Sequence, residues 1–424
     1  MRIAVRAPAS SANLGPGFDA LGLALDLWNE VEVDTEGPPG RITIEGRDAA
    51  LLRADASTGE RENLVLTAMR TLAEAHGRAL PPLALTLRNA VPVARGLGSS
   101  AAALVAGLLA ADRLLGLDLA DAVRYGHAWR MEGHGDNVGA AHYGGAVLAV
   151  PGVAEAVRLW PTAGAIHLTG GEPHGGLPAG GPANGRPSPN GSPHAVSAPA
   201  ANAGATGPAS SAGSASDGVS THATAGPAVG QAAAATATES AATTTDAAAT
   251  KAVVAAADGP LHGLTAVAFV PEITGATWAA RAALPAHVPH PDAAHNVATA
   301  SGLVVGLLSG DRALLAAGMH DRLHEPYRAR LFPHLAPMAE AARAAGAVGA
   351  CLSGAGPTVL ALVTPAAAPA VRAALTRTAA VLRVPGEAIL LAPIGRGAHV
   401  VGEPCRTRIT ADRSASVAPG PHRP

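Results

Sequence analysis

Residues 92–102 read Pro-Val-Ala-Arg-Gly-Leu-Gly-Ser-Ser-Ala-Ala and run directly into an apolar, alanine-rich segment. Gly96 and Gly98 allow the backbone to turn tightly and to approach a ligand without an intervening side chain. Ser99 and Ser100 stand where a helix N-cap is expected, with the first N–H groups of the helix pointing outward. Because such N–H groups and the helix dipole attract anions, this junction predicts a phosphate-binding loop. Taken alone, the same glycines are also compatible with a turn that caps an ordinary helix.

The chain has a single lysine, Lys251, among its 30 Lys and Arg residues. A Walker-type NTPase needs the lysine of a G-x-x-x-x-G-K-[ST] loop and a protein kinase needs a strand lysine, so both classes are excluded. Schiff-base chemistry would depend on Lys251 itself, which lies in a segment that we interpret as unfolded. A bound nucleotide is therefore expected to be held by backbone amides, arginines and a metal ion.

The middle of the chain differs in composition from the rest. Ala, Gly, Ser, Thr, Pro and His predominate in residues 170–258, and no Phe, Tyr or Trp occurs between Trp160 and Phe269. Such a stretch buries too little apolar surface to offset the entropy of ordering it. We predict a disordered low-complexity insert there, with a short helix near 247–257. The insert could be an inert linker or a tether for a partner.

The remaining chain is rich in Val, Leu, Ala and Ile, which predicts two packed domains at 1–165 and 259–405 and a flexible tail at 410–424.

The net charge is −2 and no basic stripe is present, so nucleic acid is not an expected partner. No apolar leader follows Met1 and no run reaches the roughly 18 apolar residues of a membrane helix, so no membrane association is expected. Cys351 and Cys405 form neither a disulfide framework nor a zinc motif. We therefore expect a cytoplasmic protein.

Hydrophobic periodicity predicts both helices and strands along the two domains. The strands are expected at 1–7, 21–33, 42–44, 83–87, 144–150, 264–270, 350–353 and 358–363. The helices are expected at 63–77, 101–115, 119–131, 277–284, 293–308, 311–320 and 336–345. Strands and helices do not alternate strictly, which favours an α+β fold over a doubly wound parallel sheet.

A polar block follows the first predicted strand. Residues 10–19 read Ser-Ser-Ala-Asn-Leu-Gly-Pro-Gly-Phe-Asp, and the Gly-Pro-Gly turn would present Asn13 and Asp19 together. An asparagine amide both donates and accepts hydrogen bonds, and an aspartate is a counter-ion for an ammonium group. The block could equally be a structural turn.

A second block, Glu-Gly-His-Gly-Asp-Asn at 132–137, combines four polar residues with two glycines. We expect an irregular loop here, because a helix would spread Glu132, His134, Asp136 and Asn137 around its axis. A glutamate oxygen is a suitable ligand for Mg²⁺, which usually bridges phosphates. Taken alone, the block could be a solvated polar loop.

Two arginine motifs stand in the second half of the chain. Thr277-Trp-Ala-Ala-Arg281 places Thr277 and Arg281 four residues apart, on one helix face, and His324-Glu-Pro-Tyr-Arg328 supplies a second arginine. Arginine binds a carboxylate through two hydrogen bonds of fixed geometry. Singly, each arginine could form a surface ion pair instead. Residues 352–358, Leu-Ser-Gly-Ala-Gly-Pro-Thr, would by themselves be a β-turn.

Together these blocks resemble the GHMP kinases, and most closely the homoserine kinase branch of that family. The loop at 92–102 resembles the family's phosphate loop, and residues 352–358 resemble its C-terminal motif. The branch itself is indicated by residues 10–19, by 132–138 (E-G-H-x-D-N-V) and by T-x-x-A-R-x-x-L-P and H-x-P-Y-R. The family commonly has proline where this chain has Gly135. Asn63-Leu-Val65 resembles the segment near the adenine pocket.

The resemblance implies two α+β domains with the active site between them, and the reaction ATP + L-homoserine → ADP + O-phospho-L-homoserine, a step toward threonine. It implies that the nucleotide contacts Asn63 and the loop residues Pro92, Val93, Ala94, Arg95, Gly96, Leu97, Gly98, Ser99, Ser100, Ala101 and Ala102. Mg²⁺ would lie at Ser100 and Glu132.

The resemblance also implies a substrate site. Arg281 and Arg328, with Thr277 in the same motif, would bind the carboxylate, and Asp19 would pair with the ammonium group. The hydroxyl would be surrounded by Asn13, His134, Asp136 and Asn137. Catalytic roles fall to Asn13, Glu132, Asp136 and Asn137, without an assigned general base. A homodimer is compatible with the sequence. A mevalonate or sugar kinase of the same family, or a non-catalytic member that only binds ligand, stays open as an alternative.

Overall fold

A long antiparallel hairpin organises the first sheet. Its strands, β1 and β2, pair from Arg2 opposite Asp34 to Asn13 opposite Gly17. The sheet runs β11-β1-β2-β4-β3, with β5 pairing β2 and β6, and only β3 and β4 are parallel. Its strands are β1 (Arg2–Asn13), β2 (Gly17–Asp34), β3 (Ile42–Gly46), β4 (Ala84–Asn89), β5 (Ala146–Leu148), β6 (Val157–Trp160) and β11 (His399–Val400).

The first predicted strand is confirmed but is longer than expected. Proline interrupts a strand ladder because it has no N–H to donate, so the pattern alone ends the strand at residue 7. The pairing with β2 instead shifts register between Pro8 and Ala9 and continues to Asn13. This irregularity carries the polar block of residues 10–13 along the sheet instead of into a loop.

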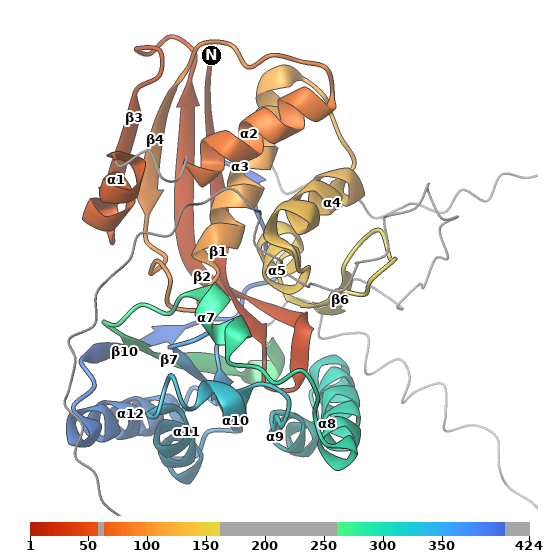
Figure 1. Cartoon of the computed structure of the whole chain (residues 1–424), viewed down its shortest axis with the longest axis vertical. Coiled ribbons are helices and arrows are strands. Elements are labelled where there is room, and N and C mark those ends of the chain that lie inside the picture. Colours follow the sequence, from red (N-terminus) through yellow and green to blue (C-terminus); the bar gives the residue numbers. More distant parts are fainter. Residues whose placement is uncertain (58–62, 162–260, 403–424) are drawn as a thin grey trace, which may run out of the picture. The chain divides into compact units, whose positions relative to one another are not determined.

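Helices cover the first sheet, with α3 in the centre. Helix α3 packs against β1, β2, α2, α4 and α5 (Figure 1). Its alanines at 101, 102, 106, 110 and 111 are fully buried, and their small side chains permit this close packing. The helices of this part are α1 (Ala49–Ser57), α2 (Leu64–Ala75), α3 (Ser99–Leu115), α4 (Asp121–Glu132) and α5 (Asp136–Tyr143).

The second sheet is antiparallel, with strand order β10-β7-β9-β8. Alternate residues of β7 face opposite sides: Val267 and Phe269 pack toward α11 and α12, whereas Ala266, Ala268 and Val270 join a core shared with the first sheet. The strands are β7 (Thr265–Pro271), β8 (Gly349–Leu352), β9 (Val359–Val363) and β10 (Gly386–Leu391). The helices are α7 (Thr277–Ala282), α8 (His290–Ser309), α9 (Arg312–Gly318), α10 (Glu325–Arg328), α11 (Leu335–Ala344) and α12 (Ala368–Leu382).

The computed structural model describes residues 1–57, 63–161 and 261–402, and all of these belong to one compact unit. The predicted insert at 170–258, its short helix and the tail at 410–424 lie outside the described residues. The strand β11 follows the second sheet in sequence but pairs with β1 of the first. No helix in the described ranges is long and apolar enough to cross a membrane.

The α+β fold and most predicted elements are confirmed, but the prediction for residues 132–137 is wrong. Residues 132–137 are not one irregular loop, because Glu132 ends α4 and Asp136 already begins α5. Only the three residues from Gly133 to Gly135 separate the helices, and Gly133 has a left-handed φ of 89°. The polar side chains therefore converge because two helix ends meet at a sharp turn.

Candidate active site

The phosphate loop ends at Gly98, which is the N-cap of α3 and has a φ of 71°. Ser99 and Ser100 are therefore the first two residues of the helix, and their prediction as N-caps is wrong. The left-handed conformation favours glycine at this cap, and no side chain caps the helix. The N–H groups of the first turn have no intrahelical acceptor, which leaves them available to an anion.

Gly96 and Gly98 lie against other parts of the chain. Gly96 has a φ of 80°, and a Cβ there would collide with the carbonyl oxygen of Ser353. A Cβ on Gly98 would collide with the hydroxyl of Ser10. The loop is therefore held between the N-terminal polar block and the C-terminal glycine turn, and its shape depends on both glycines.

The predicted blocks meet around one cavity of about 850 Å³, which lies within the usual size range of ligand-binding cavities. Four loop residues turn away from it and are buried in the protein, namely Pro92, Leu97, Ala101 and Ala102. All the other predicted site residues line it: Asn13, Asp19, Asn63, Val93, Ala94, Arg95, Gly96, Gly98, Ser99, Ser100, Glu132, His134, Asp136, Asn137, Thr277, Arg281 and Arg328.

Ser100 and Glu132 contact each other beside the phosphate loop. The Ser100 hydroxyl donates a hydrogen bond of 2.6 Å to Oε1 of Glu132. Both residues are half-buried and line the cavity. A hydroxyl oxygen and a carboxylate oxygen at the start of a helix form a donor set that a hard divalent cation accepts.

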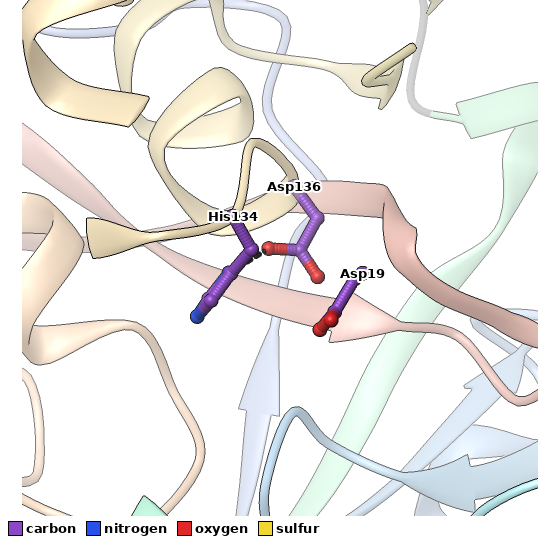
Figure 2. Close-up of side chains that lie close together, drawn as sticks. All are labelled: Asp19, His134 and Asp136. Atoms are coloured by element: carbon purple, nitrogen blue, oxygen red, sulfur yellow. Dashed lines mark hydrogen bonds and ion pairs between the residues drawn. The ribbon is translucent and has the colours of Figure 1, made fainter. Parts of the chain in front are cut away.

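Asp19, His134 and Asp136 form an acidic cluster in the same cavity, with their ligand atoms within 4.8 Å of one another. Oδ1 of Asp136 lies 2.5 Å from Nδ1 of His134 and accepts the N–H of Asn137 at 2.6 Å. Oδ2 of Asp136 is buried without a hydrogen-bond partner, and Figure 2 shows it directed toward Asp19. The cluster therefore has an unused acceptor that a cationic donor could satisfy.

The charge of this cluster acts on His134. Burial by itself lowers the pKa of the imidazole, but the hydrogen bond and the charge of Asp136, with Glu132 and Asp19, raise that pKa above its usual value. The ring is therefore a proton donor toward Asp136 over a wider pH range than an exposed histidine would be. This fixes Oδ1 of Asp136 and leaves Oδ2 free for other contacts.

The two predicted arginines have different hydrogen-bond partners in the protein. Arg281 forms a two-bonded ion pair with Asp19, at 3.0 and 2.9 Å. Arg328 is buried and donates to the carbonyl oxygens of Ala280 at 3.2 Å and Gly354 at 3.1 Å. The predicted carboxylate and ammonium partners of a substrate are thus already bound to each other in the free protein.

Other predicted residues serve partly as structural contacts. The guanidinium of Arg95 donates to Asp48 and to the carbonyl oxygens of Pro271 and Glu272, so it joins the two sheets. Asn63 caps α2 by accepting N–H groups of the helix's first turn. Asn13 donates to the carbonyl oxygen of Gly354 at 2.8 Å. Thr277, at the start of α7, is exposed.

Sequence reasoning missed several residues that organise the site. Ser10 donates to Oδ1 of Asn137 at 2.9 Å and so fixes the orientation of that amide. Ser353 donates to the carbonyl oxygen of Gly96 at 2.6 Å. Phe18 lies beneath the two arginines. Ser10 and Phe18 stand inside the quoted block 10–19, but their partners are distant in sequence and no local pattern identifies them.

Behind Arg328, the carboxyl group of Glu325 accepts the N–H of Leu352 at 2.6 Å. Burial raises the pKa of this carboxyl to about 8, so the folded state holds a proton that the unfolded state releases near pH 4.5. The protonated carboxyl of Glu325 therefore makes its full contribution to the free energy of unfolding below pH 4.5. This contribution is lost as the pH rises toward 8, and the loss is at most about 5 kcal/mol. We expect Glu325→Gln, which keeps the acceptor oxygen, to retain its stability over this range.

Urea unfolding of both proteins at pH 5, 6.5 and 8 would measure this effect. The two proteins should be similar in stability at pH 5, and the variant should be more stable at pH 8. Parallel pH dependence of the two midpoints would show that Glu325 is ionised in the folded protein.

Comparison with known proteins places this fold and site in one class. The chain matches the family models described as GHMP kinases N terminal domain, over residues 63–145, and GHMP kinases C terminal, over residues 303–381. GHMP kinases are ATP-dependent small-molecule kinases, and the combination of phosphate loop and cavity agrees with that class.

Curated relatives give a narrower answer. A homoserine kinase of Synechococcus sp. is 32% identical over 398 residues, which cover 93% of this chain and 97% of that protein. A homoserine kinase of Moorella thermoacetica is 30% identical over 400 residues, covering 94% and 99%. The chain belongs to the homoserine kinases of the GHMP kinase family.

Solved structures agree on the fold. The crystal structure of homoserine kinase from Cytophaga hutchinsonii is similar with a TM-score of 0.64 at 24% identity, covering 94% of this chain and 97% of that one. The L. major mevalonate kinase in complex with R-mevalonate is similar with a TM-score of 0.52 at 13% identity, covering 93% and 95%. Likeness at these identities shows a shared fold and does not distinguish substrates.

Proposed function

We propose that this chain transfers the γ-phosphoryl group of ATP to the side-chain hydroxyl of L-homoserine, in a step of threonine biosynthesis. The observation that carries the proposal is the meeting of the phosphate loop with the Asp19–Arg281 pair in one cavity. The loop suits a triphosphate, and the pair offers one partner for each charge of an amino acid. A mevalonate or sugar substrate has no ammonium group to match Asp19.

Ser100 and Glu132 fit a magnesium ion carried with the nucleotide, because they present hard oxygens at the start of α3. When bound, the ion supplies charge neutralisation to the transferring phosphoryl group. The first N–H groups of α3 hold the phosphates, and Glu132 orients the Ser100 hydroxyl. Since the guanidinium of Arg95 is engaged with Asp48 and backbone carbonyls, these N–H groups carry most of the phosphate contact.

The amino-acid substrate inserts into the ion pair between Asp19 and Arg281. Its carboxylate replaces Asp19 on the guanidinium, and its ammonium group replaces Arg281 on the carboxylate. Every charge keeps a partner before and after binding, so the exchange avoids the cost of an unpaired ion. The unpartnered Oδ2 of Asp136 adds a second acceptor for the ammonium group. Arg328 and Thr277 complete the carboxylate site.

The substrate hydroxyl lies among Asn13, His134, Asp136 and Asn137 in this proposal. Phosphoryl transfer through a loose transition state depends mainly on positioning and charge stabilisation, so a strong base is not required. Asn137, whose amide oxygen accepts the Ser10 hydroxyl, orients the nucleophile. We assign these residues to orientation, and we assign no general base.

The proposal is tested with a coupled ADP-release assay using Mg-ATP and a panel of L-homoserine, L-threonine, L-serine, mevalonate and galactose. Turnover confined largely to L-homoserine would support it. Turnover of mevalonate or galactose alone would retain the phosphate loop and refute the substrate. Binding of ATP with no turnover across the panel would indicate a member that is not a homoserine kinase.

Loss of the Glu132 charge should weaken the use of Mg²⁺. We expect Glu132→Gln to raise the Mg²⁺ concentration needed for half-maximal turnover, with kcat reduced by on the order of 10²-fold, since a charged metal ligand becomes neutral. Titration of MgCl₂ at fixed ATP measures this, with Glu340→Gln on α11 as an exposed control. An unchanged Mg²⁺ dependence would remove Glu132 from the metal site.

Three further predictions concern domain borders, oligomeric state and location, and they stay predictions. They are the domain borders at 1–165 and 259–405, the homodimer and the cytoplasmic location. We propose them together with the function. Light scattering on the purified full-length chain tests the dimer directly, because a monomer mass would refute it.

A further inference from the structure

The ring of Phe18 lies next to both substrate-site arginines. The guanidinium carbon of Arg328 lies 5.3 Å from the ring centroid, and that of Arg281 lies 5.8 Å from it. The imidazole of His324 packs on the same side chain at 5.2 Å between ring centroids. The chain has only three phenylalanines, and this one follows directly on the Gly-Pro-Gly turn.

The two arginines repel each other. Burial, and next the charge of Arg281, lower the pKa of Arg328. Arg281 has a carboxylate partner in Asp19, but within the described residues Arg328 forms no ion pair, and its guanidinium contacts two carbonyl oxygens and Nδ1 of His324. The charges of Asp19 and Asp321 act in the opposite direction but only in part, because the pKa of Arg328 stays lowered. A buried guanidinium without a carboxylate is unfavourable unless another group compensates its charge.

An aromatic face is such a group. The ring quadrupole is negative over its faces, and it attracts a guanidinium within about 6 Å of the centroid. Both arginines satisfy this distance over a single ring. The ring therefore offsets part of the repulsion between two cations and fixes where each lies, even before a carboxylate arrives.

We propose that Phe18 is a positioning residue, which holds Arg281 and Arg328 at the spacing that receives the carboxylate of the amino-acid substrate. This inference rests on the proposed function, because it concerns the binding of L-homoserine. While Asp19 leaves Arg281 and turns to the ammonium group, the ring retains the guanidinium beside Arg328. The two arginines then meet the carboxylate without first losing their arrangement.

Replacement of Phe18 by mono-, di- and trifluorophenylalanine in the full-length chain tests this directly. Fluorine withdraws charge from the ring face and changes ring size little, so a purely structural role would be insensitive to it. We expect the KM for L-homoserine to rise stepwise, to about tenfold with three fluorines. The KM for ATP and the Tm should stay unchanged. The same series at Phe269, which packs in the apolar core of the second sheet, is the matched control.

Two conventional variants complete the test. Phe18→Leu keeps an apolar side chain without a π face and should raise the KM for L-homoserine about as much as the trifluorinated ring does. Phe18→Tyr keeps the π face and should have the KM of the wild-type enzyme. If the KM for L-homoserine stays at the wild-type value in all the fluorinated variants, the role of Phe18 is overturned and the proposed function is left intact. Failure of the unsubstituted enzyme to phosphorylate L-homoserine would instead overturn the proposed function, and this inference with it.

Discussion

Gly96→Ala is expected to reduce kcat/KM for ATP by on the order of 10²–10³-fold, the loss expected when aligned anion-binding N–H groups are displaced. Gly96 has a φ of 80°, and an added Cβ would collide with the carbonyl oxygen of Ser353. Backbone does not yield as a flexible side chain can, so the loop itself must move. Because the loop continues into Gly98 and α3, the phosphate-binding N–H groups move with it.

The control for this prediction lies at the other end of the same helix. Gly116 has a φ of 62° but open space around its Cβ position. Gly116→Ala therefore introduces backbone strain of about 1 kcal/mol without a collision. We expect it to lower the Tm slightly and to leave the KM for ATP unchanged. Equal losses of ATP affinity in the two variants would show that the collision at Ser353 is irrelevant.

Arg281→Ala is expected to raise the KM for L-homoserine by about 30- to 150-fold, the effect of losing one charged partner at a partly exposed site. In the free protein this substitution also leaves Asp19 without an ion-pair partner, because among the described residues its carboxylate is paired only with Arg281. The KM for ATP should change little, because Arg281 lies outside the phosphate loop. Steady-state kinetics with each substrate varied in turn separates these two effects.

Arg322→Ala is the matched control, because this arginine pairs with Asp292 on an exposed surface. The double variant Asp19→Asn, Arg281→Gln gives a second check. Since the two side chains satisfy each other before substrate binds, removing both should cost less stability than the two single losses added together. Strict additivity would argue that the ion pair does not form in solution, and exchange of its partners with the substrate would then be untenable.

The turn at Gly96 and Gly98 and the helix that follows it were predictable because the backbone conformation there is set locally. Glycines at 96 and 98 followed by small residues favour one short turn and a helix start, whatever the rest of the protein does. The α12 helix was missed although Val371, Leu375 and Ala379 repeat at a helical spacing and are buried. The α5 helix was missed because it is short. Its eight residues begin with two polar ones, which leaves too few apolar positions to show a helical periodicity.

Side-chain roles were less predictable than the loop. Ser99 was expected to cap α3, but the left-handed cap requires Gly98. Arg95 was expected at the nucleotide and lines the cavity, and its guanidinium also donates to Asp48 and to three backbone carbonyls, those of Val93, Pro271 and Glu272. A polar residue can satisfy its hydrogen bonds on a ligand or within the protein. Which alternative holds depends on groups brought to it by packing.

By itself, the sequence determined the α+β class, the loop at the start of α3 and the family, because each of these depends on short motifs and on their order along the chain. Only the tertiary structure decided that Arg281 binds Asp19 across 262 residues of sequence, that Ser10 fixes Asn137, and that one phenylalanine ring serves two arginines. The physical reason is the range of the interactions. Backbone conformation is governed by neighbouring residues, whereas the partner of a charged or polar side chain is set by the packing of the two sheets against each other.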